Sequence, residues 1–176
     1  MRVIEYDPDS VPEESRMRLN DDLERARETA MRILASAGRS KKDLQARLES
    51  KGHSVEICEE LVDRLEEVGL INEHETACMI ARTRFSERGR SRRAIAEELQ
   101  RKGFTQDAIA LALEQIEPED EREAVLMLAR KRLAKDAHAD TPTRIRRALG
   151  HLTRKGYAPG MSMACIREVL ANEPDI

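Results

Sequence analysis

The sequence predicts an all-α protein made of three tandem three-helix repeats that form an elongated, curved molecule. Three observations predict this fold. Apolar residues recur at spacings of three and four, which is typical of amphipathic helices. A stretch of the chain is repeated about fifty residues later, and a Lys-Gly pair returns at the same place in each copy. No segment alternates as a strand would, and all six prolines lie outside residues 13–117.

The internal repeat sets the expected organisation of the chain. Gly38–Lys42 (GRSKK) matches Gly89–Arg93 (GRSRR) at an offset of 51. A looser third copy aligns Lys155–Tyr157 with Lys102–Phe104 at an offset of 53, with about four residues inserted near Pro159–Ala164. Repeats of this length are typical of stacked supersecondary units. We therefore expect a flexible acidic leader at residues 1–20, repeats at 21–70, 71–117 and 118–172, and a tail at 173–176.

The first helix of each repeat has small and apolar residues on one face. In the first copy these residues are Ala26, Ala30 and Ile33, which follow the spacing of a helix that packs on one side only. The three helices are expected at Asp21–Ala37, Glu73–Ser86 and Glu119–Lys135.

The second helix of each repeat begins at a capping residue and ends before a glycine. Ser40 is a favourable N-cap, and Asp43 completes a capping-box pattern before Leu44. In the third repeat Thr141 is the expected cap and Pro142 the first helical residue. The glycines are expected in left-handed backbone, which disfavours any residue with a Cβ. They are Gly52, Gly103 and Gly156.

The third helix begins at Ser54 in the first copy and at Thr105 in the second. Its apolar residues Val55, Cys58 and Val62 keep the three-and-four spacing. Cys58 aligns with Ile109 of the next copy, so we expect this cysteine to be a small core residue.

Charge is segregated along the chain although the net charge is only −3. Residues 82–103 carry a net charge of +5 and residues 130–155 carry +7, whereas residues 56–75 and 114–123 carry −7 and −5. Such alternation favours docking to a surface of complementary charge or to a phosphate backbone. A solvated outer face is the alternative interpretation of each cluster.

Several function classes have no support in the sequence. It lacks the glycine-rich motifs of nucleotide-binding and hydrolase sites, so we expect no enzyme and no cofactor. His74 and Cys78 imitate a helical zinc site but have no evident third ligand, so we expect no metal. Three separated cysteines predict no disulfide. The acidic N-terminus is unlike a secretory signal, and no apolar run is long enough to span a membrane, which indicates a cytoplasmic protein.

The run Gly69–Glu73 (GLINE), followed in order by Gly89, Arg92-Arg93 and Lys102-Gly103, resembles the central repeat of the RecX family of bacterial recombinase regulators. The resemblance extends over residues 24–171, with Thr76 where the family often has an aromatic residue. It implies a regulatory protein that binds RecA along the groove of its filament on single-stranded DNA. We expect the protein to be a monomer. The resemblance also implies inhibition of RecA's recombinase, ATPase and coprotease activities, with roles in DNA repair, recombination and the SOS response.

Basic residues of the second and third repeats are the expected partner contacts, both with RecA and with single-stranded DNA inside the filament. They are Arg82, Arg84, Arg88, Arg90, Arg92, Arg93, Arg101, Lys102, Arg144, Arg146, Arg147, Arg154 and Lys155.

The alternative is a direct DNA-binding regulator, because Ser91–Leu113 can be drawn as a helix-turn-helix-like unit. Against it, no Arg or Lys lies between Gly103 and Glu121.

Overall fold

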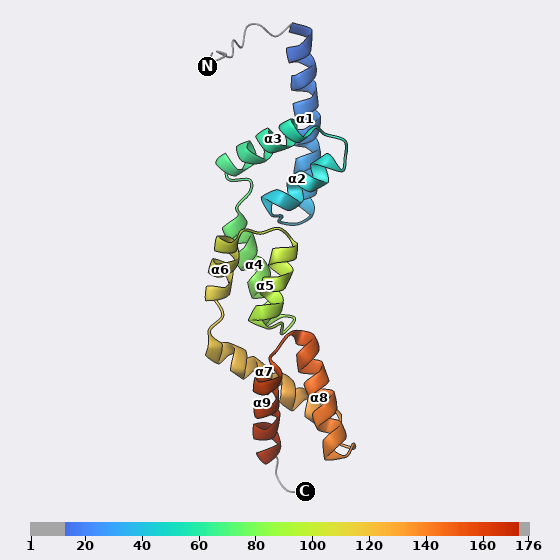
Figure 1. Ribbon diagram of the computed structural model, residues 1–176, viewed down its shortest axis with the longest axis vertical. Helices are drawn as coiled ribbons and strands as arrows, with labels where there is room; N and C mark the ends of the chain where they lie inside the picture. The colour runs from blue at the N-terminus through green and yellow to red at the C-terminus, as the bar shows by residue number, and fades with distance from the viewer. Residues whose placement is uncertain (1–12, 173–176) are drawn as a thin grey trace, which may run out of the picture. The chain divides into compact units, whose positions relative to one another are not determined.

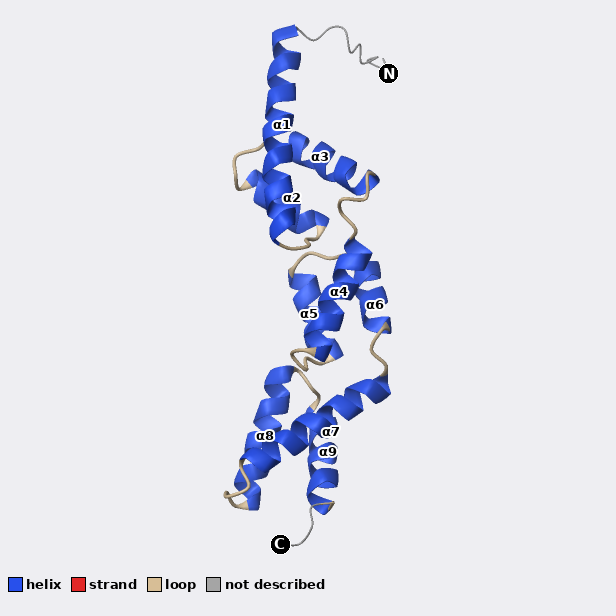
Figure 2. Cartoon of the chain, turned by 180° about the vertical axis from the view of Figure 1, so that it is seen from behind, coloured by secondary structure: helices blue, strands red, loops and turns tan. Residues whose placement is uncertain are grey.

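The computed structural model describes residues 13–172, and within this range the chain forms nine helices and no strand (Figures 1 and 2). The all-α class and the three tandem three-helix units are confirmed. In chain order the helices are α1 (Glu13–Ser36), α2 (Lys41–Glu49), α3 (Val55–Glu67), α4 (Glu73–Ser86), α5 (Arg92–Arg101), α6 (Gln106–Glu114), α7 (Pro118–Lys135), α8 (Thr141–Lys155) and α9 (Pro159–Ala171).

The start of α1 and the cap of α8 differ from the sequence prediction, and the end of α1 and the start of α7 each lie one residue from the expected position. α1 begins at Glu13, not at Asp21, so residues 13–20 of the predicted leader are helical. The reason is that these residues include no proline or glycine to interrupt the helix. Residues 1–12 and the tail at 173–176 lie outside the described residues.

Asp140, not Thr141, caps α8 by accepting a hydrogen bond from the Thr143 amide at 3.3 Å. Asp is the stronger N-cap, and its carboxylate also suits the positive end of the helix dipole.

The glycine and serine signals are confirmed. Gly52, Gly103 and Gly156 have φ angles of 92°, 79° and 96°, as expected for left-handed helix ends. The Ser40 hydroxyl accepts a hydrogen bond from the Asp43 amide at 3.1 Å, which satisfies one of the unpaired donors of the first turn.

The described residues divide into two compact units, one that ends at Asn72 and one that begins at Glu73. The first unit holds α1, α2 and α3 around a core that includes Ala26, Leu44, Leu48 and Cys58. Cys58 is fully buried there, as predicted, and burial raises the pKa of its thiol.

The second unit holds two bundles with separate cores. In one bundle α4 packs on α5 and α6 around Ile95 and Leu99, and in the other α7 packs on α8 and α9 around Leu133, Leu152 and Ile166. α9 has 13 residues whereas α6 has nine. α3 of the first unit also has 13 residues, so the length of α9 does not test the insertion predicted near Pro159.

Candidate partner-binding interface

Arg84, one of the predicted partner contacts, is engaged inside the second unit. Its guanidinium donates to both carboxylate oxygens of Glu98 at 2.8–3.0 Å, which joins α4 to α5. The two side chains are only 22% and 16% exposed. These hydrogen bonds hold the pKa of Glu98 below its usual value and raise that of Arg84. A bidentate pair of this kind fixes geometry strongly, so Arg84 has a structural role.

Three more predicted contacts have partners within the chain. Arg82 donates to Gln115, Arg93 donates to Glu97 and to the Gly156 carbonyl, and Arg147 donates to Asp136. All three arginines are exposed. The ion pair of Arg93 with Glu97 is exposed and contributes little to stability, so another partner can replace it at small cost. The carboxylate of Asp136 that Arg147 contacts is only 9% exposed, so that pair is not of this kind.

Lys102 and Arg144 of the predicted set also have an interaction within the chain. Six further arginines of the set form no ion pair in the described part of the chain. Within residues 13–172, no carboxylate forms an ion pair with the following side chains: Arg88, Arg90, Arg92, Arg101, Arg146 and Arg154. Their charges are therefore available to a binding partner.

The structure brings the two basic segments of the sequence together where the α4–α5 loop meets the end of α8. The Ser91 amide donates to the Lys155 carbonyl at 3.0 Å, and the Lys155 ammonium donates to the Arg88 carbonyl. Gly156 permits this contact, because a Cβ at that position would lie 2.5 Å from the side chains of Ala94 and Ser91. The α4–α6 and α7–α9 bundles are thereby joined within the second unit.

A pocket of about 420 Å³ lies at this contact. We name its four basic side chains the basic junction: Arg88, Lys131, His151 and Lys155. Burial, and then the charges of Lys155, Arg132 and Arg154, lower the pKa of His151. The three positive charges among these causes would stabilise an anionic group that approaches them, whereas burial, the larger cause, disfavours a charge of either sign.

Two members of the basic junction were not among the predicted contacts. Lys131 contributed to the net charge of residues 130–155, but the sequence does not show that this face of α7 lies against the end of α8. His151 is an isolated histidine in the sequence and has no motif around it. Its spacing of four residues from Lys155 on a helix is the signal that could have found it, since such residues share a face.

α6 does not offer the surface of a DNA-reading helix. Its exposed side chains include the carboxylates of Asp107 and Glu114, and its first turn is acidic. Carboxylates close to phosphates would repel them, because DNA affinity depends largely on phosphate neutralisation. This geometry weakens the helix-turn-helix alternative.

Among residues 13–172, no three His, Cys, Asp or Glu side chains are placed to hold a metal ion together. None of the helices in that range combines the length and apolar content needed to cross a bilayer.

Models of known families match two parts of the chain. Residues 26–65 match the first three-helix domain of RecX, and residues 72–113 match the second three-helix domain of RecX. These matches cover most of the first two repeats identified in the sequence.

Whole-chain relatives and solved structures agree with these matches. The regulatory protein RecX of Streptomyces coelicolor is 36% identical over 87% of this chain and 81% of its own length. That of Amycolatopsis mediterranei is 34% identical over 93% and 90%. The crystal structure of RecX from Lactobacillus salivarius shares the fold, with a TM-score of 0.75, 21% identity, and coverage of 86% of this chain and 99% of that one. The chain therefore belongs to the RecX family of regulatory proteins.

Proposed function

We propose that this chain is a non-enzymatic cytoplasmic regulator that binds the RecA filament and mainly inhibits its recombinase, ATPase and coprotease activities. Its family membership supports this proposal, because relatives that match most of the chain are regulatory proteins. The observation that carries it is the basic junction, where two basic segments of the chain meet and Arg88 has no carboxylate partner among the described residues.

Binding through charge is the mechanism that this surface supports. Arg88, Arg154 and Lys155 offer positive charge at the end of α8, where the field would attract an anionic surface and speed association. Repeated units could hold neighbouring RecA protomers together, so that several weak contacts gain avidity without one tight site. A regulator held in this way along a filament would oppose the changes that accompany filament growth and ATP hydrolysis.

Direct DNA binding is the competing function, and the two differ in what they require. A protein that binds naked single-stranded DNA through about six phosphates should lose roughly two to three orders of magnitude in affinity between about 50 and 200 mM salt. A protein that binds the filament should show strong affinity for single-stranded DNA only when RecA is present on the strand.

The test is a fluorescence-anisotropy titration of labelled single-stranded DNA, with and without RecA and a non-hydrolysable ATP analogue, at several salt concentrations. We expect affinity for the RecA-coated strand to exceed that for the naked strand by at least about tenfold at about 150 mM salt, which corresponds to about 1.4 kcal/mol. Equal affinities with the steep salt dependence of a phosphate binder would support direct DNA binding and contradict the proposal.

A further inference from the structure

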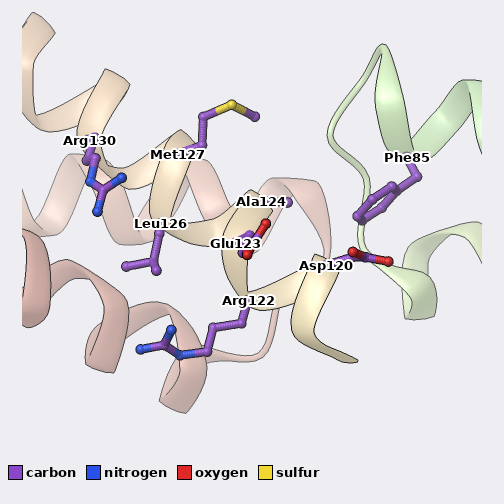
Figure 3. A pocket seen from close by; sticks show the side chains of 8 residues that line it. All are labelled: Phe85, Asp120, Arg122, Glu123, Ala124, Leu126, Met127 and Arg130. Atoms are coloured by element: carbon purple, nitrogen blue, oxygen red, sulfur yellow. The ribbon is translucent and has the colours of Figure 1, made fainter. Parts of the chain in front are cut away.

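Two adjoining pockets lie along the exposed face of α7 in the second unit. They have volumes of about 660 and 420 Å³ and share Phe85, Ala124 and Met127 as lining residues. Figure 3 shows Phe85 directed from α4 towards the first turns of α7. We name this surface the α7 groove, defined by Phe85, Ala124, Met127, Leu128 and the basic junction at one end.

The floor of the α7 groove is apolar. Met127 is 62% exposed, and Phe85 is partly exposed beside it. Phe85 is one of only two phenylalanines in the chain. Apolar side chains that gather in a groove with polar edges are typical of a surface that another molecule covers.

The charges around this floor differ between its two ends. At one end Arg88, Lys131 and Lys155 outnumber the single carboxylate of Glu87. Neither Arg88 nor Lys131 forms an ion pair with any carboxylate of residues 13–172. The hydrogen bond from Lys155 to the Arg88 carbonyl holds that ammonium in place at the pocket wall. This end is complementary to an acidic group.

We propose that the α7 groove binds an acidic protein segment that places a large apolar side chain on Met127 and Phe85 and its carboxylates on the basic junction. The inference rests on the proposed function in one respect, that RecA in its filament supplies the segment.

A protein segment fits this surface better than a nucleic-acid strand does. At the other end of the groove the carboxylates of Asp120 and Glu123 line the wall together with Arg122 and Arg130, so this end carries no excess of positive charge to hold a phosphate backbone. Arg122 at this end is already paired with Glu168. Exposed methionine is an adaptable contact for an apolar side chain, whereas sequence-independent strand binding depends on stacking platforms and continuous positive charge.

The test compares two matched pairs of variants for binding to the RecA filament on single-stranded DNA. Met127→Glu and Lys131→Glu alter the groove. Met79→Glu changes a methionine of α4 that is 55% exposed outside the groove, and Lys135→Glu reverses a charge one turn further along α7. We expect each groove variant to weaken binding at least about tenfold, as loss of a central contact does, and each control to change it less than about twofold.

Unchanged binding by both groove variants, while the wild-type chain binds the filament, would overturn the inference and leave the proposed function standing. If the wild-type chain does not bind the filament at all, both fail. Helical circular dichroism identifies any variant that does not fold.

A second measurement does not depend on the charged substitutions. A bimane label is attached to the cysteine that Met127→Cys introduces in a chain that also carries Cys78→Ala. Its emission should shift to shorter wavelength when the RecA filament is added, and oligo(dT) alone should leave it unchanged. A shift caused by oligo(dT) alone would make a nucleic-acid strand the occupant and contradict the inference. If the labelled chain binds the filament and its emission does not shift, the inference is also contradicted.

Discussion

Gly156→Ala should lower the free energy of unfolding of the second unit by about 2–5 kcal/mol. Gly156 has a φ of 96°, and the left-handed conformation costs an L-residue about 1–2 kcal/mol. The new Cβ would also lie 2.5 Å from the side chains of Ala94 and Ser91. Relieving that overlap must separate α5 from the end of α8, and overpacking of this kind costs about 1–3 kcal/mol more. Urea unfolding followed by circular dichroism measures the change.

Gly52→Ala is the matched control for this variant. Gly52 has a φ of 92°, yet a Cβ there would have no neighbour within 4 Å. It should therefore show only the backbone cost of about 1–2 kcal/mol. If the two substitutions destabilise their units equally, the close contact between α8 and α5 does not hold the two bundles of the second unit together.

Leu99→Ala should destabilise the α4–α6 bundle by about 2–5 kcal/mol. Leu99 lies on α5 with no exposed surface and belongs to the core that includes Ile95 and Phe104. Truncating a buried leucine removes apolar burial and leaves a cavity that the surrounding helices fill only in part. The same urea titration measures the loss.

Leu111→Ala supplies the comparison within the same bundle. Leu111 lies on α6 and is 43% exposed. Its truncation should change the free energy of unfolding by about 0.5 kcal/mol, as is usual for surface positions. Equal losses for Leu99 and Leu111 would contradict the placement of the α4–α6 core.

Much of the fold could be predicted from the sequence because its signals are local. The spacing of Leu44 and Leu48 identifies a buried helix face, and a glycine after lysine marks the end of that helix wherever the chain repeats it. The start of α1 and the cap of α8 could not be predicted as well. Several neighbouring residues can begin a helix, and the choice between Asp140 and Thr141 depends on small differences in capping energy.

The candidate site was less predictable because it depends on which helices face each other. The sequence shows that residues 82–103 and 130–155 are basic, but not that Ser91 contacts Lys155. It also does not show that Glu98 engages Arg84 while Arg88 stays without a carboxylate partner in the described part of the chain. Both outcomes follow from the packing of α4 on α5 and of α8 against the α4–α5 loop.

The most direct test of the proposed regulation is the rate of ATP hydrolysis by RecA on single-stranded DNA as this chain is titrated in, with filament lengths recorded in parallel. We expect the rate to fall and the filaments to shorten as the wild-type chain is added. We expect the Lys131→Glu variant to need at least about tenfold more protein for the same effect. An unchanged rate and unchanged filament lengths at a saturating concentration of the wild-type chain would contradict the account.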